Sequence, residues 1–276
     1  MNYFSRHLLG LLLLGPAISI AAADDWKLVW QDEFNTNGAP NPANWNYEQG
    51  FVRNKELQWY QPDNAVCTNG LLVIEARPQH KLNPRYRPGS NRWQSKREWI
   101  DYTSASLTTR GLQEFKYGKF EMRARIDTRL GSWPAFWTLG TERLHLGWPA
   151  CGEIDIMEYY TGTVLANIMN RHGQWSTVKE PIVKHGGELW SKEFHRWTME
   201  WDEQKIDLFL DGVRMNHLDL TQGEYTDPEN PFHQPVYLIL NQAIGATGGD
   251  PAQTKFPIRY EIDWVRVYQR AQPAAK

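Results

Sequence analysis

The stretch Gly152-Glu153-Ile154-Asp155-Ile156-Met157-Glu158-Tyr159-Tyr160 has the pattern of a β-strand with one irregularity at its centre. Its two isoleucines alternate with the first two acids, so these acids share one face of the strand while the isoleucines face a core. Regular alternation would place the third acid at position 157, where the chain has Met157. A β-bulge after Ile156 would return Glu158 to the acidic face, whereas an unbulged strand would point it the other way.

Three acids on one face of a strand repel one another, which favours a chemical role over a structural one. The alternative is a solvated polar face, but the neighbouring residues are aromatic and apolar. A retaining glycosidase needs two carboxyl groups about 5–5.5 Å apart, one to attack the anomeric carbon and one to protonate the leaving oxygen. Asp155, between Glu153 and Glu158, can tune the protonation of both.

The rest of the chain reads as further strands separated by Gly, Pro, Asn and Asp turns. The predicted strands are 26–30, 71–76, 119–126, 206–210, 213–215, 237–241 and 260–268. Asp211-Gly212 predicts a hairpin turn between two of them. We find no sustained 3.6-residue apolar period, no internal repeat and no linker, which indicates an all-β sandwich or barrel. The polar, basic segment 80–97 is expected to be a long surface loop near the cleft.

Composition narrows the function. The 276 residues carry a formal net charge of −2 with no long run of either sign, which argues against a nucleic-acid partner. The 14 tryptophans stand out. Tryptophan is costly to bury fully because its N–H needs a partner, so some of these rings are expected to line a cleft and stack on sugars, and the others to fill the core.

The N-terminus predicts export. Residues 1–23 combine a basic start, a short apolar run and a small-residue cleavage site, which is typical of a secretory signal peptide. No cysteine follows that could carry a lipid anchor, and no other apolar run reaches the ~20 residues of a membrane helix. We therefore expect a secreted or periplasmic protein with no membrane insertion, whose residues 24–276 form one catalytic domain. Cys67 and Cys151 can be a disulfide or two buried thiols.

The carboxylate strand resembles the signature of glycoside hydrolase family 16 in its bulged form, and the wider sequence resembles the bacterial laminarinases of that family. The matching stretches are WQDEF at 30–34, NKELQWY at 54–60, GSWPAFWTLG at 131–140, WPACGEIDIMEY at 148–159 and IDWVRVY at 262–268. The resemblance implies a β-jelly-roll of two curved antiparallel sheets, with a substrate cleft on the concave face.

The resemblance also implies roles for single residues. Glu153 matches the nucleophile, Asp155 the assisting acid and Glu158 the general acid/base. The candidate substrate-binding residues that it implies are Trp133, Trp137 and Trp148 in the cleft wall, Asn54 and Glu56 in a loop, and Arg110 on a strand. Many laminarinases carry a Thr-x-His motif a few residues after the last acid. This chain lacks that motif after Glu158, so Asn167 or His172 is expected to occupy the cleft instead.

Many members of the family carry a calcium ion on the convex face. The resemblance places its ligands at Glu33, the carbonyl of Gly70 and Asp263, and oxygen ligands from separated segments suit calcium. The alternative is that these acids make local hydrogen bonds. Such an ion would be structural, and we expect no cofactor in catalysis.

Three functions remain open at this level. The first is a monomeric, retaining endo-glycoside hydrolase that cleaves β-1,3- or mixed β-1,3/1,4-glucan by double displacement. The second keeps the chemistry on a β-linked (sulfated) galactan such as agarose, porphyran or carrageenan, for which four arginines of the basic segment, Arg85, Arg87, Arg92 and Arg97, would supply a cationic rim. The third is a non-catalytic polysaccharide-binding jelly roll, although such relatives usually lose one of the acids. The segments 80–97 and 174–190 depart from the family text and leave the polysaccharide unsettled.

Overall fold

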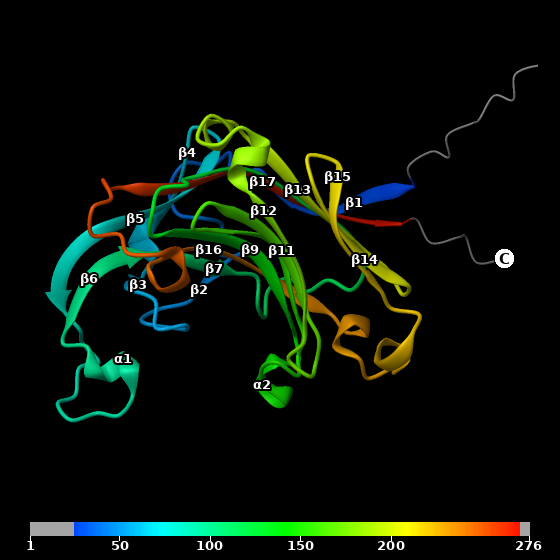
Figure 1. Ribbon diagram of the computed structural model, residues 1–276, viewed down its shortest axis with the longest axis horizontal. Coiled ribbons are helices and arrows are strands. Elements are labelled where there is room, and N and C mark those ends of the chain that lie inside the picture. Colours follow the sequence, from blue (N-terminus) through cyan, green and yellow to red (C-terminus); the bar gives the residue numbers. More distant parts are fainter. Residues whose placement is uncertain (1–24, 271–276) are drawn as a thin grey trace, which may run out of the picture.

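The computed structural model describes residues 25–270, so the predicted signal peptide lies outside the described residues. Two sheets pack face to face and bow in the same direction (Figure 1). The seven-stranded sheet has the order β12-β11-β10-β9-β16-β7-β2, and the ten-stranded sheet has the order β15-β14-β13-β8-β17-β5-β6-β3. Strand β1 joins the second sheet on β17, and β4 joins it on β5.

The elements have the following bounds. The seven-stranded sheet comprises β2 (Asn46–Tyr47), β7 (Ser106–Thr108), β9 (Ser132–Gly140), β10 (Glu153–Tyr160), β11 (Thr163–Met169), β12 (Trp175–Pro181) and β16 (Val236–Ile244). The ten-stranded sheet comprises β1 (Trp26–Asp32), β3 (Gln58–Tyr60), β4 (Ala65–Thr68), β5 (Leu71–Leu82), β6 (Trp99–Ser104), β8 (Gly118–Ile126), β13 (His195–Trp201), β14 (Lys205–Leu210), β15 (Val213–Asp219) and β17 (Ile258–Arg270). The short helices are α1 (Trp93–Lys96) and α2 (Arg143–Leu146), and the 3-10 turns are η1 (Pro62–Asn64), η2 (Ile182–His185), η3 (Trp190–Lys192), η4 (Gly223–Thr226), η5 (Pro231–His233) and η6 (Ala246–Gly248).

The hydrophobic core lies between the two sheets. Phe136, Ile154 and Leu238 reach it from the seven-stranded sheet, and Met122 and Val265 reach it from the ten-stranded sheet, all of them buried. Because successive residues of a strand point to opposite faces, filling this core directs the alternate residues of the seven-stranded sheet to its concave side. The all-β sandwich expected from the sequence is confirmed, and it is a jelly-roll of two curved sheets rather than a closed barrel.

The predicted strands are present, most of them longer than their sequence pattern indicated. The hairpin at Asp211-Gly212 is confirmed, because β14 and β15 pair across it and both turn residues have positive φ, 49° and 83°. The loop predicted at 80–97 is shorter than expected. Strand β5 continues to Leu82 and pairs with β6 across the hairpin, and α1 forms near the hairpin tip.

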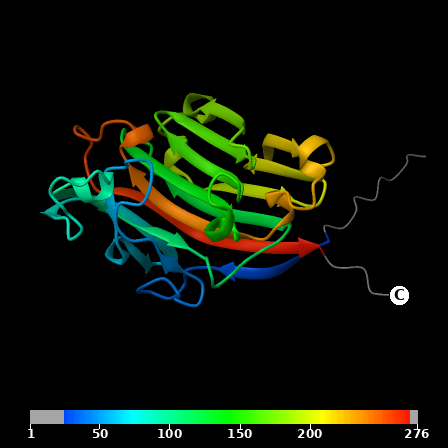
Figure 2. The ribbon, with the colours of Figure 1, turned by 90° about the horizontal axis from the view of Figure 1, so that it is seen from below.

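The two ends of the described chain lie side by side, with β1 antiparallel to β17 (Figure 2). Cys67 and Cys151 are both buried, and each is a free thiol, which settles the alternative in favour of two separate cysteines. Among residues 25–270, no helix has the length and apolar character needed to cross a membrane.

Candidate active site

The bulge predicted in the carboxylate strand is confirmed. Asp155 lies opposite Asn167 of β11, and the next residue of β10 in register is Glu158 opposite Leu165. On the other side, the register with β9 shifts between Asp155 and Met157. Ile156 and Met157 are successive residues, and both side chains are buried in the core. The bulge therefore places its additional residue on the core side of the strand. Glu158 therefore returns to the face that carries the other two acids.

The three carboxylates line one cleft of about 670 Å³ on the concave sheet. The cleft takes its walls from β9, β10, β11, β12 and β16 and from the loops beside them. Its lining residues are Arg53, Asn54, Glu56, Trp133, Ala135, Trp137, Leu139, Arg143, Trp148, Glu153, Asp155, Glu158, Tyr160, Asn167, Trp175, Thr177, Lys179, Asn241 and Thr247. A concave, partly aromatic surface with converging polar groups is suited to a polysaccharide chain.

Two tryptophan N–H groups hold the two outer carboxylates. Trp133 Nε1 donates to Glu158 Oε1 at 2.9 Å, and Trp148 Nε1 donates to Glu153 Oε2 at 2.5 Å. Each bond satisfies an indole donor and fixes a carboxylate rotamer at the same time. Trp148 is 52% exposed, so its ring is available to contact a ligand in the cleft. Two of the three tryptophans expected to line the cleft, Trp133 and Trp148, are therefore also hydrogen-bond partners of the acids.

Asn167 links Asp155 to Glu158. Its Nδ2 donates to Asp155 Oδ2 at 3.1 Å and to Glu158 Oε2 at 2.9 Å. Its Oδ1 is buried without a hydrogen-bond partner among the described residues. A buried acceptor beside two carboxyl groups is suited to a hydroxyl of a bound sugar.

Burial sets the protonation of the acids. Desolvation raises the pKa of Glu158 to about 7, and the Glu153 charge adds to this, while hydrogen bonds from Trp133, Asp155 and Asn167 act in the opposite direction. Desolvation, followed by the charges of Glu158 and Glu153, raises the pKa of Asp155 well above its usual range. Asp155 therefore keeps a proton and hydrogen-bonds to Glu153.

The Glu153 carboxyl is the one best able to ionise. Desolvation raises its pKa, but hydrogen bonds from Trp148 and Asp155 and the charges of Arg53 and Arg143 lower it. Three carboxyl groups with different partners therefore divide into one that ionises and two that hold protons near neutral pH. This division matches what acid/base chemistry requires.

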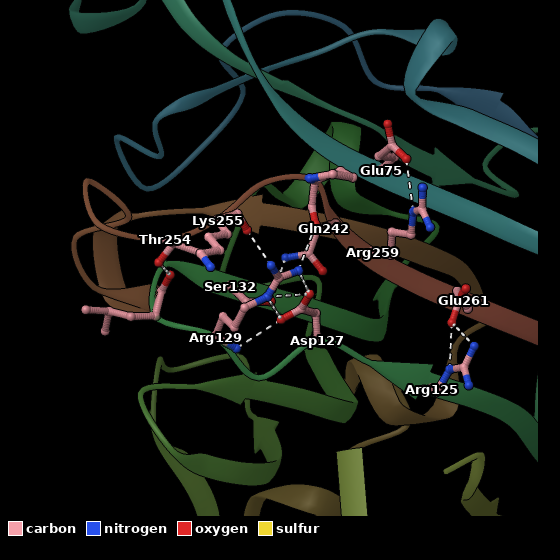
Figure 3. Close-up of polar contacts among 12 residues, drawn as sticks. Glu75, Arg125, Asp127, Arg129, Ser132, Gln242, Thr254, Lys255, Arg259 and Glu261 are labelled. Carbon is pink, nitrogen blue, oxygen red and sulfur yellow. Dashed lines mark hydrogen bonds and ion pairs between the residues drawn. The ribbon is translucent and has the colours of Figure 1, made fainter. Parts of the chain in front are cut away.

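The turn before Trp133 is fixed by a network shown in Figure 3. Arg129 pairs with Asp127 and donates to the carbonyls of Lys255 and Pro257, the latter at 2.7 Å. Gly131 N donates to Gly248 O at 2.8 Å, and a Cβ at Gly131, which has a φ of 88°, would lie 2.5 Å from Pro251. The glycine is needed for this close approach, which ties the start of β9 to the loop before β17.

A second loop, at residues 53–57, also borders the cleft, and it bonds to the end of β16 through Leu57 N and Ile244 O at 2.8 Å. Arg53 pairs with Glu48 and lies 4.9 Å over the Trp137 ring. Glu56 is 2% exposed and accepts from Gln58 Nε2 at 2.6 Å and from Asn54 Nδ2 at 3.2 Å. Trp137 in turn donates to Asn241 at 2.7 Å. The side chains of this loop are thus ordered without a ligand.

The basic segment 80–97 packs against this loop and holds it in place. Arg97 donates to the carbonyls of Glu56 and Lys55, the latter at 2.7 Å. Its guanidinium lies 4.8 Å from the centroid of Phe51 and 5.1 Å from that of Trp93. Arg85 likewise lies 5.2 Å over Trp59. Two of the four arginines expected to form a cationic rim are therefore engaged in packing and hydrogen bonds.

Most of the predicted substrate-binding residues meet in the cleft, and two do not. Arg110 and His172 are absent from the cleft lining. His172 instead pairs with Glu224 at 2.9 Å, because the turn after β11 carries the chain away from the carboxylates. The Arg110 carbonyl accepts from Asn46 Nδ2 at 3.0 Å. Of the two residues offered for the position after Glu158, Asn167 is the one in the cleft.

Several lining residues were not predicted from the sequence. Trp175, Thr177 and Lys179 are alternate residues of β12, so a period-2 pattern was available to identify them. Tyr160, which contacts Trp133 edge-on at 5.7 Å, ends the carboxylate strand itself. Arg53 directly precedes Asn54, which was predicted, whereas Asn241 belongs to a strand that carried no sequence signal of a place in the cleft. Trp175 is 46% exposed and extends the aromatic wall beyond Trp148.

The two predicted calcium ligands that are side chains, Glu33 and Asp263, have other partners in this structure. Both carboxylate oxygens of Glu33 accept from Arg266, at 2.7 and 2.9 Å, and Asp263 pairs with Arg123. No group of three or more His, Cys, Asp and Glu side chains that could hold a metal is found within residues 25–270. As arranged here, these side chains do not fit a calcium ion unless both arginines release them. Calcium at this place stays a prediction.

Comparison with known proteins agrees with this geometry. The chain is 34% identical over 289 residues to a beta-glucanase of Rhodothermus marinus, covering 95% of this chain and 91% of that protein. The laminarinase catalytic domain of Thermotoga maritima aligns with a TM-score of 0.77 and 37% identity, covering 90% of this chain and 100% of that one. A structure of the endo-acting O-glycanases that human gut microbiota members express to initiate mucin breakdown aligns with a TM-score of 0.79 and 32% identity, covering 90% and 92%.

The fold and the acid-lined cleft define a polysaccharide-active glycoside hydrolase with a jelly-roll scaffold. The profile of glycosyl hydrolases family 16 matches residues 54–266, which include the cleft, the carboxylate strand and most of both sheets. The chain belongs to glycoside hydrolase family 16.

Proposed function

We propose that this protein is a retaining, endo-acting hydrolase of β-1,3-glucan or mixed β-1,3/1,4-glucan, with Glu153 as nucleophile and Glu158 as general acid/base. The observation that carries the proposal is the bulge in β10, which puts Glu153, Asp155 and Glu158 on one cleft wall. The wall is buried enough to keep Glu158 protonated near neutral pH.

In the first step, Glu158 donates its proton to the glycosidic oxygen while Glu153 attacks the anomeric carbon. The bond to the leaving sugar breaks, and a glycosyl ester to Glu153 forms. The raised pKa of Glu158 supplies the acid form, and the proton on Asp155 keeps a second charge away from Glu153. The Trp148 N–H holds the attacking carboxylate in place.

In the second step, Glu158, now ionised, takes a proton from water, and the water oxygen attacks the same anomeric carbon. Glu153 leaves as a carboxylate, and two inversions give net retention. Asn167 and Trp133 remain bonded to Glu158 through both steps, so its position need not change as its charge changes.

The substrate assignment is supported by the beta-glucanase and laminarinase relatives and by the four tryptophans, Trp133, Trp137, Trp148 and Trp175, that line the cleft. A second candidate, cleavage of a β-galactoside-containing glycan, is favoured by one observation: a keratan-sulfate endo-1,4-beta-galactosidase of Sphingobacterium multivorum is 28% identical to this chain over 260 residues, covering 90% of this chain and 56% of that protein. A sulfated substrate has less support, because Arg85 packs on Trp59 and Arg97 bonds to loop carbonyls, so that neither arginine is free to bind sulfate. The non-catalytic alternative loses support because all three acids face the cleft.

The deciding experiment measures new reducing ends on laminarin, lichenan, barley β-glucan, agarose, carrageenan and mucin. We expect activity on the glucans, with a rapid fall in viscosity and with the anomeric configuration retained in the first NMR spectra. Activity on the galactans or mucin alone would refute the glucan assignment in favour of the second candidate. Products of inverted anomeric configuration would refute the two-step mechanism. No reducing ends on any substrate would revive the binding module.

Two variants test the roles of the acids. Glu153→Ala and Glu158→Ala should each lower kcat by at least about 10⁴-fold. With an aryl glycoside that needs no acid assistance, azide should rescue both variants. The azide product should be inverted for Glu153→Ala, since azide replaces the nucleophile, and retained for Glu158→Ala, since azide replaces the water. Identical products from both variants would contradict the assignment.

We further propose that the protein acts outside the cytoplasm as a monomer. The expected signal peptide and the polymeric substrate, which is too large to enter a cell, support the location. Fractionation of the native host and the elution volume of the purified protein in size-exclusion chromatography would test the two points.

A further inference from the structure

A second hollow lies beside the cleft, at the edge of the sheet that carries β6. It has a volume of about 310 Å³ and is lined by Leu57, Arg97, Glu98, Trp99, Asp101 and Tyr102. Leu57 directly follows Glu56, which lines the cleft, so the same loop separates the two spaces. Figure 1 shows β6 on the same side of the molecule as α1, away from α2. The volume is at the lower end of the range for small-ligand sites, about 300–1,000 Å³.

Trp99 presents a prepared aromatic surface at this hollow. It is 41% exposed although it is a strand residue. His80 of β5 stacks on it with ring centroids 4.3 Å apart and an interplanar angle of 13°. His80 is itself held by Asp101, with Nδ1 and Oδ1 2.8 Å apart, and it does not line the hollow. The indole is thus supported on one face while the rest of it borders the empty space.

The polar groups around Trp99 suit a neutral polyol. Arg97 supplies N–H donors, of which some bond to the loop carbonyls, and the carboxylates of Glu98 and Asp101 accept hydroxyl protons. Arg97 offsets only one of the two carboxylates, which leaves the lining with a formal charge of −1 and disfavours an anion. A flat aromatic ring bordered by mixed donors and acceptors matches the apolar face and hydroxyl rim of a hexose.

We propose that Trp99 and this hollow form a second carbohydrate-binding subsite, separate from the catalytic cleft, for a neutral hexose of the polysaccharide chain. The identity of that polysaccharide rests on the proposed function. A chain held at Trp99 raises the effective concentration of its remaining units at the nearby cleft. Long substrates gain from this, whereas a short oligosaccharide that fills only the cleft does not.

The test uses Trp99→Thr, which removes the ring but keeps a strand-forming residue, and Trp99→Tyr, which keeps a flat ring beside His80. The matched control is Leu82→Ala. Leu82 pairs with Trp99 across the β5–β6 ladder and is 62% exposed, but it does not line the hollow. Melting temperatures of all variants should equal that of the parent.

Binding is measured as retardation in native gels that contain laminarin or barley β-glucan. All variants carry Glu158→Gln in addition, so that the polysaccharide is not cleaved during the measurement. Trp99→Thr should weaken retardation about 3- to 10-fold, Trp99→Tyr should restore most of it, and Leu82→Ala should leave it unchanged. In the active enzyme, Trp99→Thr should raise KM for the polymer by a similar factor and leave kcat/KM for a short oligosaccharide unchanged.

The outcomes separate the two proposals. Retardation that depends on Trp99 without any hydrolysis by the parent would refute the proposed function and keep the subsite. Hydrolysis with no effect of Trp99→Thr on retardation would refute the subsite. An equal loss on polymer and oligosaccharide would also refute it, because the ring would then act only through the cleft.

Discussion

Asn167 Nδ2 lies 2.9 Å from Glu158 Oε2, and the same nitrogen lies 3.1 Å from Asp155 Oδ2. One amide thus connects the proposed acid/base to the acid that is expected to stay protonated. The bulge makes this possible, because without it Asn167 of β11 would face only Asp155.

Replacing Asn167 should affect both the rate and its pH dependence. Asn167→Ala removes hydrogen bonds to two buried carboxyl groups, each worth about 1.5–3 kcal/mol, so kcat should fall about 10- to 100-fold. The Asn167 bond lowers the pKa of Glu158, so its loss should raise that pKa and move the alkaline limb to higher pH. Rate profiles on laminarin measure both effects. His172→Ala, on a residue outside the cleft, should change neither; an unchanged Asn167→Ala profile would remove the residue from the mechanism.

The carboxylate strand shows how far the sequence could predict the site. The bulge was predictable because only an extra residue between Ile156 and Glu158 brings the third acid to the chemistry. The positions of Trp133 and Trp137 in the cleft were implied by the resemblance to the family, and the structure places both on β9 in the cleft lining. His172 was misplaced because sequence distance from Glu158 does not reveal where the turn after β11 leads. Asn241 was missed because its place in the cleft depends on long-range strand order, which local patterns do not encode. Arg53 directly precedes the predicted Asn54 and could have been included with it.

The wild-type pH profile should report the proton on Glu158. A raised pKa of about 7 means that the acid form is present below that pH and is lost above it, so kcat/KM should fall as pH rises through about 7. Trp133→Phe removes the N–H that lowers this pKa, and its alkaline limb should therefore lie at higher pH. In Trp133→Phe we also expect kcat/KM to fall about 10-fold. A limb that moves to lower pH in Trp133→Phe would contradict the assignment of that limb to Glu158.

Glu158→Gln should stabilise the fold at alkaline pH. The carboxyl titrates near 4.5 when unfolded and near 7 when folded, so ionisation of the buried group costs stability as pH rises between these values. Glutamine keeps the shape and stays neutral. The free energy of unfolding of the variant is compared with that of the parent at pH 4 and at pH 8. The advantage of the variant should be on the order of 2 kcal/mol, or about 5 °C in Tm, larger at pH 8 than at pH 4. The exposed Glu114→Gln is the control, and equal Tm differences at both pH values would show that burial does not penalise the Glu158 charge.

Arg97→Ala should weaken substrate binding without removing the chemistry. The loop that it supports holds Asn54 and Lys55 at φ values of 54°, a left-handed conformation that costs about 1 kcal/mol or more for each non-glycine residue. Arg97 fixes this conformation through the Lys55 and Glu56 carbonyls, so its loss lets the loop relax away from the cleft. For an oligosaccharide that spans only the cleft, KM should rise about 10-fold while kcat stays within about two-fold. Arg97→Lys should restore part of the affinity, and Arg87→Ala, on an exposed arginine of the same segment, should have no effect. A fall in kcat with unchanged KM would show that Arg97 acts on the carboxylates instead of on the loop.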